Sequence, residues 1–280
     1  MTKRSATLAV AVTKTLLELI LAVSKDLTPI LDSWSHDPEN FSVRIIQGDD
    51  GRDKIQVRLD LGVLQMEIDG RPDGETPEGQ ESWFDVFRRR QKSHDSAHPD
   101  GASFQLSAND CKLLVREGVQ YYHRYLSFWH LERYELCARD TARNLKLFAF
   151  VKEFAAKDQD KLMFDQYRPY VTMMHAKAVA TPLIELGQHD AAIQVIDAAI
   201  AGIRQFLEEY DQLDKAERCG ELTHLELWRE QIVARKPALP PPPPDPVDQL
   251  RSDLQQAIAE ERFEEAARLR DELRRQNKLG

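Results

Sequence analysis

Alternating apolar and polar residues predict a small β-sheet in the first hundred residues of the chain. Phe41–Gln47 alternates residue by residue, as a half-buried strand does, and Ile55–Asp60 repeats the pattern. A third stretch of this kind, Val63–Ile68, follows directly. The glycine- and aspartate-rich sequences Gly48–Gly51 and Asp69–Gly74 are strong turn signals. We therefore expect an antiparallel sheet of two or three strands.

Helical periodicity replaces strand alternation from about residue 103 onward. Ser107 and Asp110 have the spacing of a capping box, which marks the first turn of a helix. The long apolar-periodic stretches that follow are Asp110–Leu126, Trp129–Ala155, Tyr170–Leu186, Asp190–Tyr210 and Glu221–Arg235. Ahead of this region, Ser82–Gln91 predicts a short helix, whereas the polar stretch His94–Gly101 predicts a loop.

Two stretches of the helical region are similar to each other, namely Trp129–Asp140 and Leu186–Ile200. The second resembles the turn and second helix of a tetratricopeptide unit. The two stretches begin more than fifty residues apart, well beyond the roughly 34-residue period of such repeats. We therefore expect packed helix pairs of that general kind rather than a regular array.

A proline-rich stretch, Pro237–Pro246, separates the helical region from the C-terminal residues. Such a run favours polyproline II, which extends by about 3.1 Å per residue and acts as a spacer. The sequence thus predicts an α+β fold that is mainly α. The expected organisation is an N-terminal α/β region at 1–102, a helical domain at 103–236, a linker at 237–246 and a helical hairpin at 247–280.

The C-terminal residues predict two short amphipathic helices. Asp245 can cap a helix that Pro246 opens at its first position, where the missing N–H costs nothing. The apolar stripes consist of Leu250, Leu254, Ala257 and Ile258 on the first helix, and Phe263, Ala266, Ala267, Leu269 and Leu273 on the second. A hairpin this short cannot bury a self-sufficient core. Its apolar stripes must therefore be covered by a second copy, by another hairpin or by the body of the same chain. Phe263, at the junction of the helices, is the expected central anchor.

The same stretch resembles the UVR domain. The residues that carry the resemblance are Leu250–Leu254, Ala257-Ile258 and above all Glu261–Leu273, with Phe263, the Ala266-Ala267 pair and Leu269–Asp271 each in place. The family occurs in the B and C subunits of the bacterial UvrABC excinuclease, in the activator of the bacterial protein-arginine kinase and in Clp-type unfoldases. In the excinuclease subunits it is a protein-docking hairpin. The resemblance therefore implies a protein partner, which is UVR-containing, Clp-type or an excinuclease component, or self-association.

Net charge and cysteine content indicate which partners and which cellular compartment to expect. The net charge of −9 gives no general attraction to nucleic acid or anionic lipid. Arg88–Lys92 is the main basic cluster, either a solvated helix end or a contact for nucleic acid or an acidic partner. Cys111, Cys137 and Cys219 are far apart and form no CxxC pair, so we expect reduced thiols in a cytoplasmic protein.

The N-terminal apolar stretch Leu8–Val23 is interrupted by Lys14 and Glu18 and is too short to span a bilayer. Those internal charges also argue against a signal peptide. We interpret the stretch as an amphipathic or buried helix that ends at Pro29. No membrane association is expected, since a Lys/Arg cluster on its polar face is missing.

No residue pattern predicts catalysis, a cofactor or a metal site. P-loop, dinucleotide-binding, nucleophile-elbow and HExxH motifs are all missing from the sequence. His123 and His130 are seven residues apart on one helical stretch, without zinc-like spacing. The polar loop His94, Asp95, His98 and Asp100 is a second, weaker metal candidate, and the carboxylates that could bind Mg²⁺ in or after the strands are Asp60, Glu67, Asp69 and Asp73.

These observations favour a non-enzymatic bacterial adaptor that binds partner proteins through its hairpin and its helical domain. One alternative is an accessory factor of nucleotide excision repair. Another is an enzyme with a carboxylate site in the N-terminal sheet. The expected protein-binding residues are Leu250, Leu254, Ile258, Phe263, Ala266, Ala267, Leu269 and Leu273.

Overall fold

A three-stranded antiparallel sheet forms the N-terminal part of the structure, a computed structural model that describes residues 26–99, 101–235, 246–260 and 262–276. Its strands are β1 (Val43–Gln47), β2 (Asp53–Leu59) and β3 (Gly62–Glu67), in the order β1-β2-β3. A short helix, α2 (Thr28–Asp32), precedes them. The predicted strands are therefore confirmed, and so are the predicted turns at Gly48–Gly51, between β1 and β2, and at Asp69–Gly74, after β3.

The register of the sheet places most of the apolar residues of the three strands on one face. Val57 of β2 pairs with Val43 of β1 on one side and with Leu64 of β3 on the other. Ile55 pairs in the same way with Ile45 and with Met66 of β3. The alternation seen in the sequence thus separates this face from the opposite one, which carries the side-chain ladder Arg44–Gln56–Gln65.

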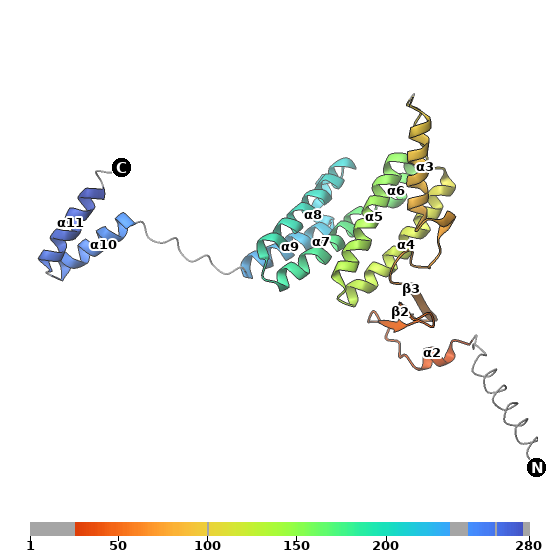
Figure 1. Cartoon of the computed structure of the whole chain (residues 1–280), viewed down its shortest axis with the longest axis horizontal. Helices are drawn as coiled ribbons and strands as arrows, with labels where there is room; N and C mark the ends of the chain where they lie inside the picture. Colours follow the sequence, from red (N-terminus) through yellow and green to blue (C-terminus); the bar gives the residue numbers. More distant parts are fainter. Residues whose placement is uncertain (1–25, 100, 236–245, 261, 277–280) are drawn as a thin grey trace, which may run out of the picture. The chain divides into compact units, whose positions relative to one another are not determined.

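Helices make up most of the chain, which confirms the predicted fold class of a mainly α protein with a small sheet (Figure 1). Those after the sheet are α3 (Trp83–Ala97), α4 (Ala108–His130), α5 (Tyr134–Phe154), α6 (Asp158–Asp165), α7 (Arg168–Glu185), α8 (His189–Glu209) and α9 (Gly220–Arg235), with short 3-10 turns η1 (Pro77–Gly79) and η2 (Leu213–Arg218). The predicted capping box is present, since Ser107 and Asp110 bond each other's backbone N–H at the start of α4.

The long helices pack in sequence, α4 on α5, α5 on α7 and α7 on α8, so that they lie side by side in Figure 1. Three apolar clusters fill the spaces between them. One joins α3, α4, α5 and α6, and a second joins α7, α8 and α9. The third joins the apolar face of the sheet to α4, α5 and α7 through Ile55, Val57, Phe128 and Met174. The sheet and the helices therefore share one core.

Three helices of this core end in the same way, with a residue in the left-handed region. These residues are Glu132 (φ 57°) after α4, Gly187 (φ 73°) after α7 and Asp211 (φ 52°) after α8. In each case the following N–H bonds a carbonyl five residues back, as in Arg133 N–H to Phe128 O at 2.8 Å. This is the Schellman motif, which satisfies the last carbonyls of a helix and turns the chain sharply.

Three helix boundaries differ from the sequence-based expectation. Helix α3 runs to Ala97, because the ring of His94 stacks on His98 at 4.3 Å and meets Phe104 edge-on. The break predicted between Leu126 and Trp129 lies instead at Leu131–Arg133, where the Schellman turn at Glu132 separates α4 from α5. Helix α6 was not predicted at all.

The chain divides into two compact units, residues 1–233 and 234–280, and the predicted boundary near residue 102 falls inside the first. The predicted N-terminal helix Leu8–Val23 lies outside the described residues, and so does nearly all of the proline-rich linker. No helix within the described ranges is long and apolar enough to cross a membrane.

Candidate functional site

The second compact unit is a hairpin of two helices, α10 (Pro246–Ala259) and α11 (Phe263–Gln276), which pack against each other. The N–H of Arg262 bonds the carbonyl of Ala257 over 2.8 Å, which turns the chain between them. Arg262 also pairs with Glu260 at 2.7 Å and with Glu265 across the turn. Local hydrogen bonds and ion pairs thus stabilise the turn between the two helices.

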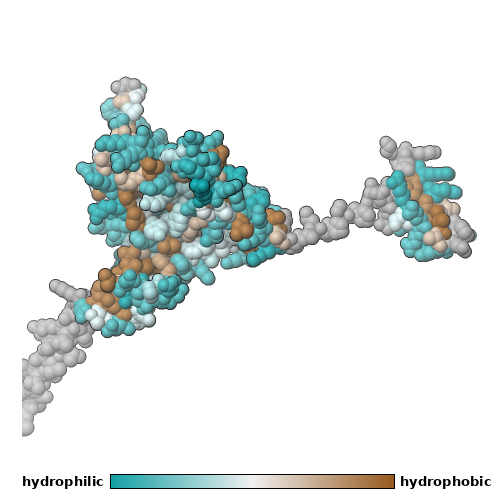
Figure 2. Space-filling model, turned by 180° about the vertical axis from the view of Figure 1, so that it is seen from behind, coloured by the Kyte–Doolittle hydropathy of each residue, from teal (hydrophilic) through white to brown (hydrophobic). Residues whose placement is uncertain are grey.

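The interior of the hairpin is small. Ala257 of α10 is 1% exposed and Leu273 of α11 is 8% exposed. Leu250, Leu254, Ala267 and Leu269 are half-buried, whereas Ile258 is 55% exposed. A continuous hydrophobic stripe therefore remains on the surface of the unit, between hydrophilic flanks (Figure 2). A stripe of this kind on so small a unit marks an interaction surface.

The predicted site residues thus fall on the two helices as expected, but their exposure differs. Ile258 lies on the surface, and Leu273 is buried against the other helix. The side chains of Phe263 and Ala266 lie outside the described part of the structure, so the anchor role of Phe263 stays a prediction.

The carboxylates predicted as a possible metal site do not converge. Asp60 contacts His36 at 2.6 Å, and Glu67 accepts from Lys54 at 2.5 Å. Asp69 pairs with Arg139 of α5 at 2.7 Å. Asp73 lies near two other groups, accepting from Gln120 at 2.7 Å and pairing with Arg71 at 3.0 Å. Each carboxylate therefore has its own partner.

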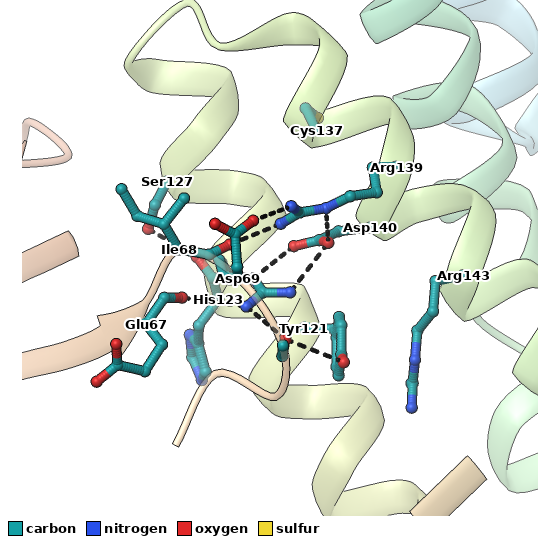
Figure 3. A network of polar contacts seen from close by, with 12 residues as sticks. Glu67, Ile68, Asp69, Tyr121, His123, Ser127, Cys137, Arg139, Asp140 and Arg143 are labelled. Carbon is teal, nitrogen blue, oxygen red and sulfur yellow. Dashed lines mark hydrogen bonds and ion pairs between the residues drawn. The ribbon is translucent and has the colours of Figure 1, made fainter. Parts of the chain in front are cut away.

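A buried polar network that sequence reasoning missed connects the loop after β3 to the helices. Arg124 of α4 donates to both oxygens of Asp140 on α5, at 2.6 and 3.1 Å, and also to the carbonyls of Glu67 and Gly70. Figure 3 shows Asp140 and Arg139 side by side, facing the loop that carries Asp69. Arg124 therefore links α5, through Asp140, to the loop that follows the sheet.

A second buried carboxylate, Glu117 of α4, caps a helix from outside. It is fully buried and accepts from the backbone N–H groups of Trp83 and Phe84, at 2.7 and 3.1 Å. Those groups belong to the first turn of α3, where intrahelical partners are missing. Arg143 of α5 donates to the same carboxylate and lies 3.9 Å over the ring of Tyr121.

The remaining candidates are separate from one another. His123 borders a groove beside Tyr122, whereas His130 stacks on Phe41 with ring centroids 4.4 Å apart. Throughout the described residues, no three His, Cys, Asp or Glu side chains come together as they would around a metal ion. In the basic cluster Arg88–Lys92, Arg89 and Arg90 pair with Glu78. That pairing reduces the positive charge the cluster presents.

Comparison with known proteins identifies the hairpin. The family model described as the UvrB/uvrC motif matches residues 245–278, a stretch that includes all of α10 and α11. No curated protein and no solved structure matches the chain. The predicted UVR resemblance is therefore confirmed for the hairpin, and the tetratricopeptide-like character of the helical region stays a prediction. In UvrB/UvrC-type proteins this motif takes part in protein–protein interactions.

Proposed function

We propose that this chain is a non-enzymatic, cytoplasmic bacterial adaptor. In this proposal the hairpin docks onto one partner protein, and the helices of the first unit hold a second. The observation that carries the proposal is the match of the hairpin to the UvrB/uvrC motif. The hairpin's surface adds support, because a unit with so little buried apolar area gains stability from a partner that covers its stripe.

The exposed end of the stripe is the expected contact. Ile258, at 55% exposure, follows one turn after the half-buried Leu254 on the same face of α10. Binding energy at interfaces concentrates in a few large apolar or aromatic side chains. We therefore expect Ile258, Leu254 and Phe263 to contribute most of the affinity.

Local pairing in the first unit supports a role without catalysis. The carboxylates near the sheet are held by Lys54, Arg139 and Gln120, and the buried carboxylates Glu117 and Asp140 hold helices and loop together. Groups committed to such contacts are poor general acids or bases, because a base needs a free lone pair within reach of its substrate.

Two classes of partner are compatible with the motif. One is a Clp-type unfoldase or the protein-arginine kinase system, and the other is the excision-repair excinuclease. The description of the matching family favours testing the excinuclease subunits first. A nucleic-acid partner is disfavoured by the net charge of −9.

The test uses the full chain as bait in lysate of the native bacterium, with the chain truncated after residue 236 in parallel. Proteins retained by the full chain and absent from the truncated one are hairpin partners. The purified partner is then titrated with the Phe263→Ala and Ile258→Ala variants. We expect each to weaken binding by about 10- to 30-fold, since loss of an anchor costs roughly 1.4–2 kcal/mol.

The matched control is Gln256→Ala, which truncates an exposed side chain on the opposite face of α10. Its affinity should stay within about threefold of the unaltered chain. Partners retained equally by the full and truncated chains would contradict docking through the hairpin. Equal affinities for all three variants would contradict the assigned surface.

A further inference from the structure

A groove of about 710 Å³ opens in the first unit between α4, α5, α6 and α7, with the start of α9 at its edge. Its walls are mostly apolar and aromatic, and its volume is that of a site for a small molecule, which typically measures about 300–1,000 Å³. Nothing in the proposed docking through the hairpin uses this groove. Its polar groups are few, and they decide what it can bind.

Three tyrosines converge on the groove. The ring of Tyr122 lies 5.5 Å from that of Tyr125 and 6.2 Å from that of Tyr170, centroid to centroid. Tyr125 is 1% exposed, and none of the described residues hydrogen-bonds the hydroxyl of any of the three. By contrast, Tyr121 donates to the carbonyl of Gly70.

This contrast points to a ligand. Most buried hydroxyls in proteins are bonded within the chain. Tyr210 follows that rule outside the groove, since it donates to Asp165 over 2.7 Å. The hydroxyl of Tyr125, on a ring that is itself buried, is instead open to the groove, where a group entering from outside the chain can bond it.

The charged residues that line the groove determine whether it favours a positive or a negative ligand. Glu221 of α9 lines it, and no lysine or arginine appears among the described lining residues. Burial lowers the pKa of His123, so this imidazole is neutral at pH 7. Burial, with smaller contributions from groups that include Glu221, raises the pKa of Tyr170 to about 12, so its hydroxyl keeps its proton. The groove thus combines the carboxylate of Glu221 with several aromatic rings. A carboxylate and an aromatic ring each attract a cation.

We propose that this tyrosine groove binds a small organic cation, an amine with an apolar body. Its ammonium group lies at Glu221 and the hydroxyls of Tyr125 and Tyr170, and its apolar part packs along Phe148 and Val171. An anion of the same shape is repelled by Glu221 and finds no compensating cation in the lining. The adaptor's helical unit is then a receptor for a small amine, whether or not the hairpin docks as proposed.

The experiment compares three probes of one shape in calorimetric titration of the full chain. They are phenylbutylamine, phenylbutanol and phenylbutyrate, which carry a cationic, a neutral and an anionic head on the same apolar body. We expect the amine to bind at least about tenfold more tightly than the carboxylate, with the alcohol between them.

Two substitutions then separate charge from hydrogen bonding. Glu221→Gln should weaken the amine about tenfold and leave the alcohol within about threefold, because only the cation uses the charge. Tyr125→Phe keeps the ring and should weaken amine and alcohol together. Glu230→Gln on the exposed side of α9 and Tyr134→Phe outside the groove are the controls, and neither should change binding.

Saturable amine binding that Glu221→Gln weakens selectively would establish the site. Equal affinities for amine and carboxylate, amine binding unaffected by either groove substitution, or no amine binding by the full chain would each overturn it. Thermal melts of both variants show whether they are folded. A failure here leaves the hairpin's docking intact, because that docking is read out with the truncated chain and Ile258→Ala.

Discussion

The guanidinium of Arg124 contacts both carboxylate oxygens of Asp140, over 2.6 and 3.1 Å, where each side chain is only 1% exposed. The same guanidinium donates to the carbonyls of Glu67 and Gly70 in the loop after β3. A single side chain of α4 therefore joins α5 to the sheet. Its charge is matched by Asp140, and each of its three nitrogens donates to an oxygen, so the cost of burying it is offset.

Breaking this pair should destabilise the whole first unit. Asp140→Ala leaves Arg124 buried without a counter-charge, and such a loss typically costs about 3–5 kcal/mol. Urea unfolding followed by circular dichroism measures the change. Asp197→Ala is the control, because its pair with Arg229 is exposed and worth about 0–1 kcal/mol. Equal losses for the two variants would show that the buried pair has no special role.

Removing the carboxylate of Glu117, which caps α3, should lower the stability of the first unit and also loosen the first turn of α3. In Glu117→Gln, the amide keeps one acceptor oxygen for the N–H groups of Trp83 and Phe84 and removes the charge facing Arg143. We expect a loss of about 2–3 kcal/mol, since hydrogen bonds to a charged group are worth roughly 1.5–3 each. Hydrogen exchange should accelerate at Trp83 and Phe84 more than in α8. Uniform exchange across the unit would contradict the capping role.

The sheet, the capping box at Ser107 and the hairpin were predictable from sequence, because each rests on local pattern. Strand alternation and helical periodicity report which face is buried, and turn residues report where the chain reverses. The hairpin's second helix also has a distinctive string of residues. These signals need no knowledge of what the elements pack against.

The buried network and the groove were not predictable, because their parts are distant in sequence. Arg124 and Asp140 look like ordinary helix-surface residues, and only the packing of α4 on α5 buries them. Tyr122 and Tyr125 likewise meet Tyr170 only when α7 packs nearby. The turn at Glu132 was missed because a non-glycine residue holds the left-handed conformation there.

The two compact units should unfold independently. Removal of the residues after 236 should leave the urea midpoint of the first unit nearly unchanged, because the chain divides at about residue 233 and the proline-rich linker follows. The measurement is paired urea melts of the full chain and the truncated one. A shift equivalent to more than about 2 kcal/mol would mean that the hairpin belongs to the core.

The cysteines should differ in their reaction with a thiol reagent. Burial raises the pKa of Cys111 to about 11 and that of Cys137 to about 12, and both side chains are inaccessible. Cys219 is half-buried, although its pKa is raised too. Because the thiolate is the reactive form, the native chain should be modified at Cys219 first, and at the others only on unfolding. Peptide mapping after brief alkylation identifies the modified site, and early labelling at Cys137 would contradict the structure.

Stability should fall as the solution is acidified below neutrality. Burial lowers the pKa of His123 and His175 below the ordinary value of 6.5, so the unfolded chain binds protons there that the folded chain does not. Their contribution is complete above pH 6.5 and is lost as pH falls toward the folded-state pKa values. Urea melts at about pH 7.5 and 5.5 should show this decrease, and His175→Asn should reduce it. A stability that rises on acidification would contradict it.

The core shared by the sheet and the helices also determines when the sheet can complete its packing during synthesis. The face of β2 and β3 that carries Ile55 and Met66 packs partly on Met174 and Ala178 of α7. During synthesis those strands leave the ribosome roughly a hundred residues before Met174 and Ala178 do. At roughly 5–20 residues per second, the nascent apolar face waits several seconds to tens of seconds for its cover. The apolar face of the N-terminal sheet is therefore exposed to misassembly during that interval of translation, when chaperone protection matters.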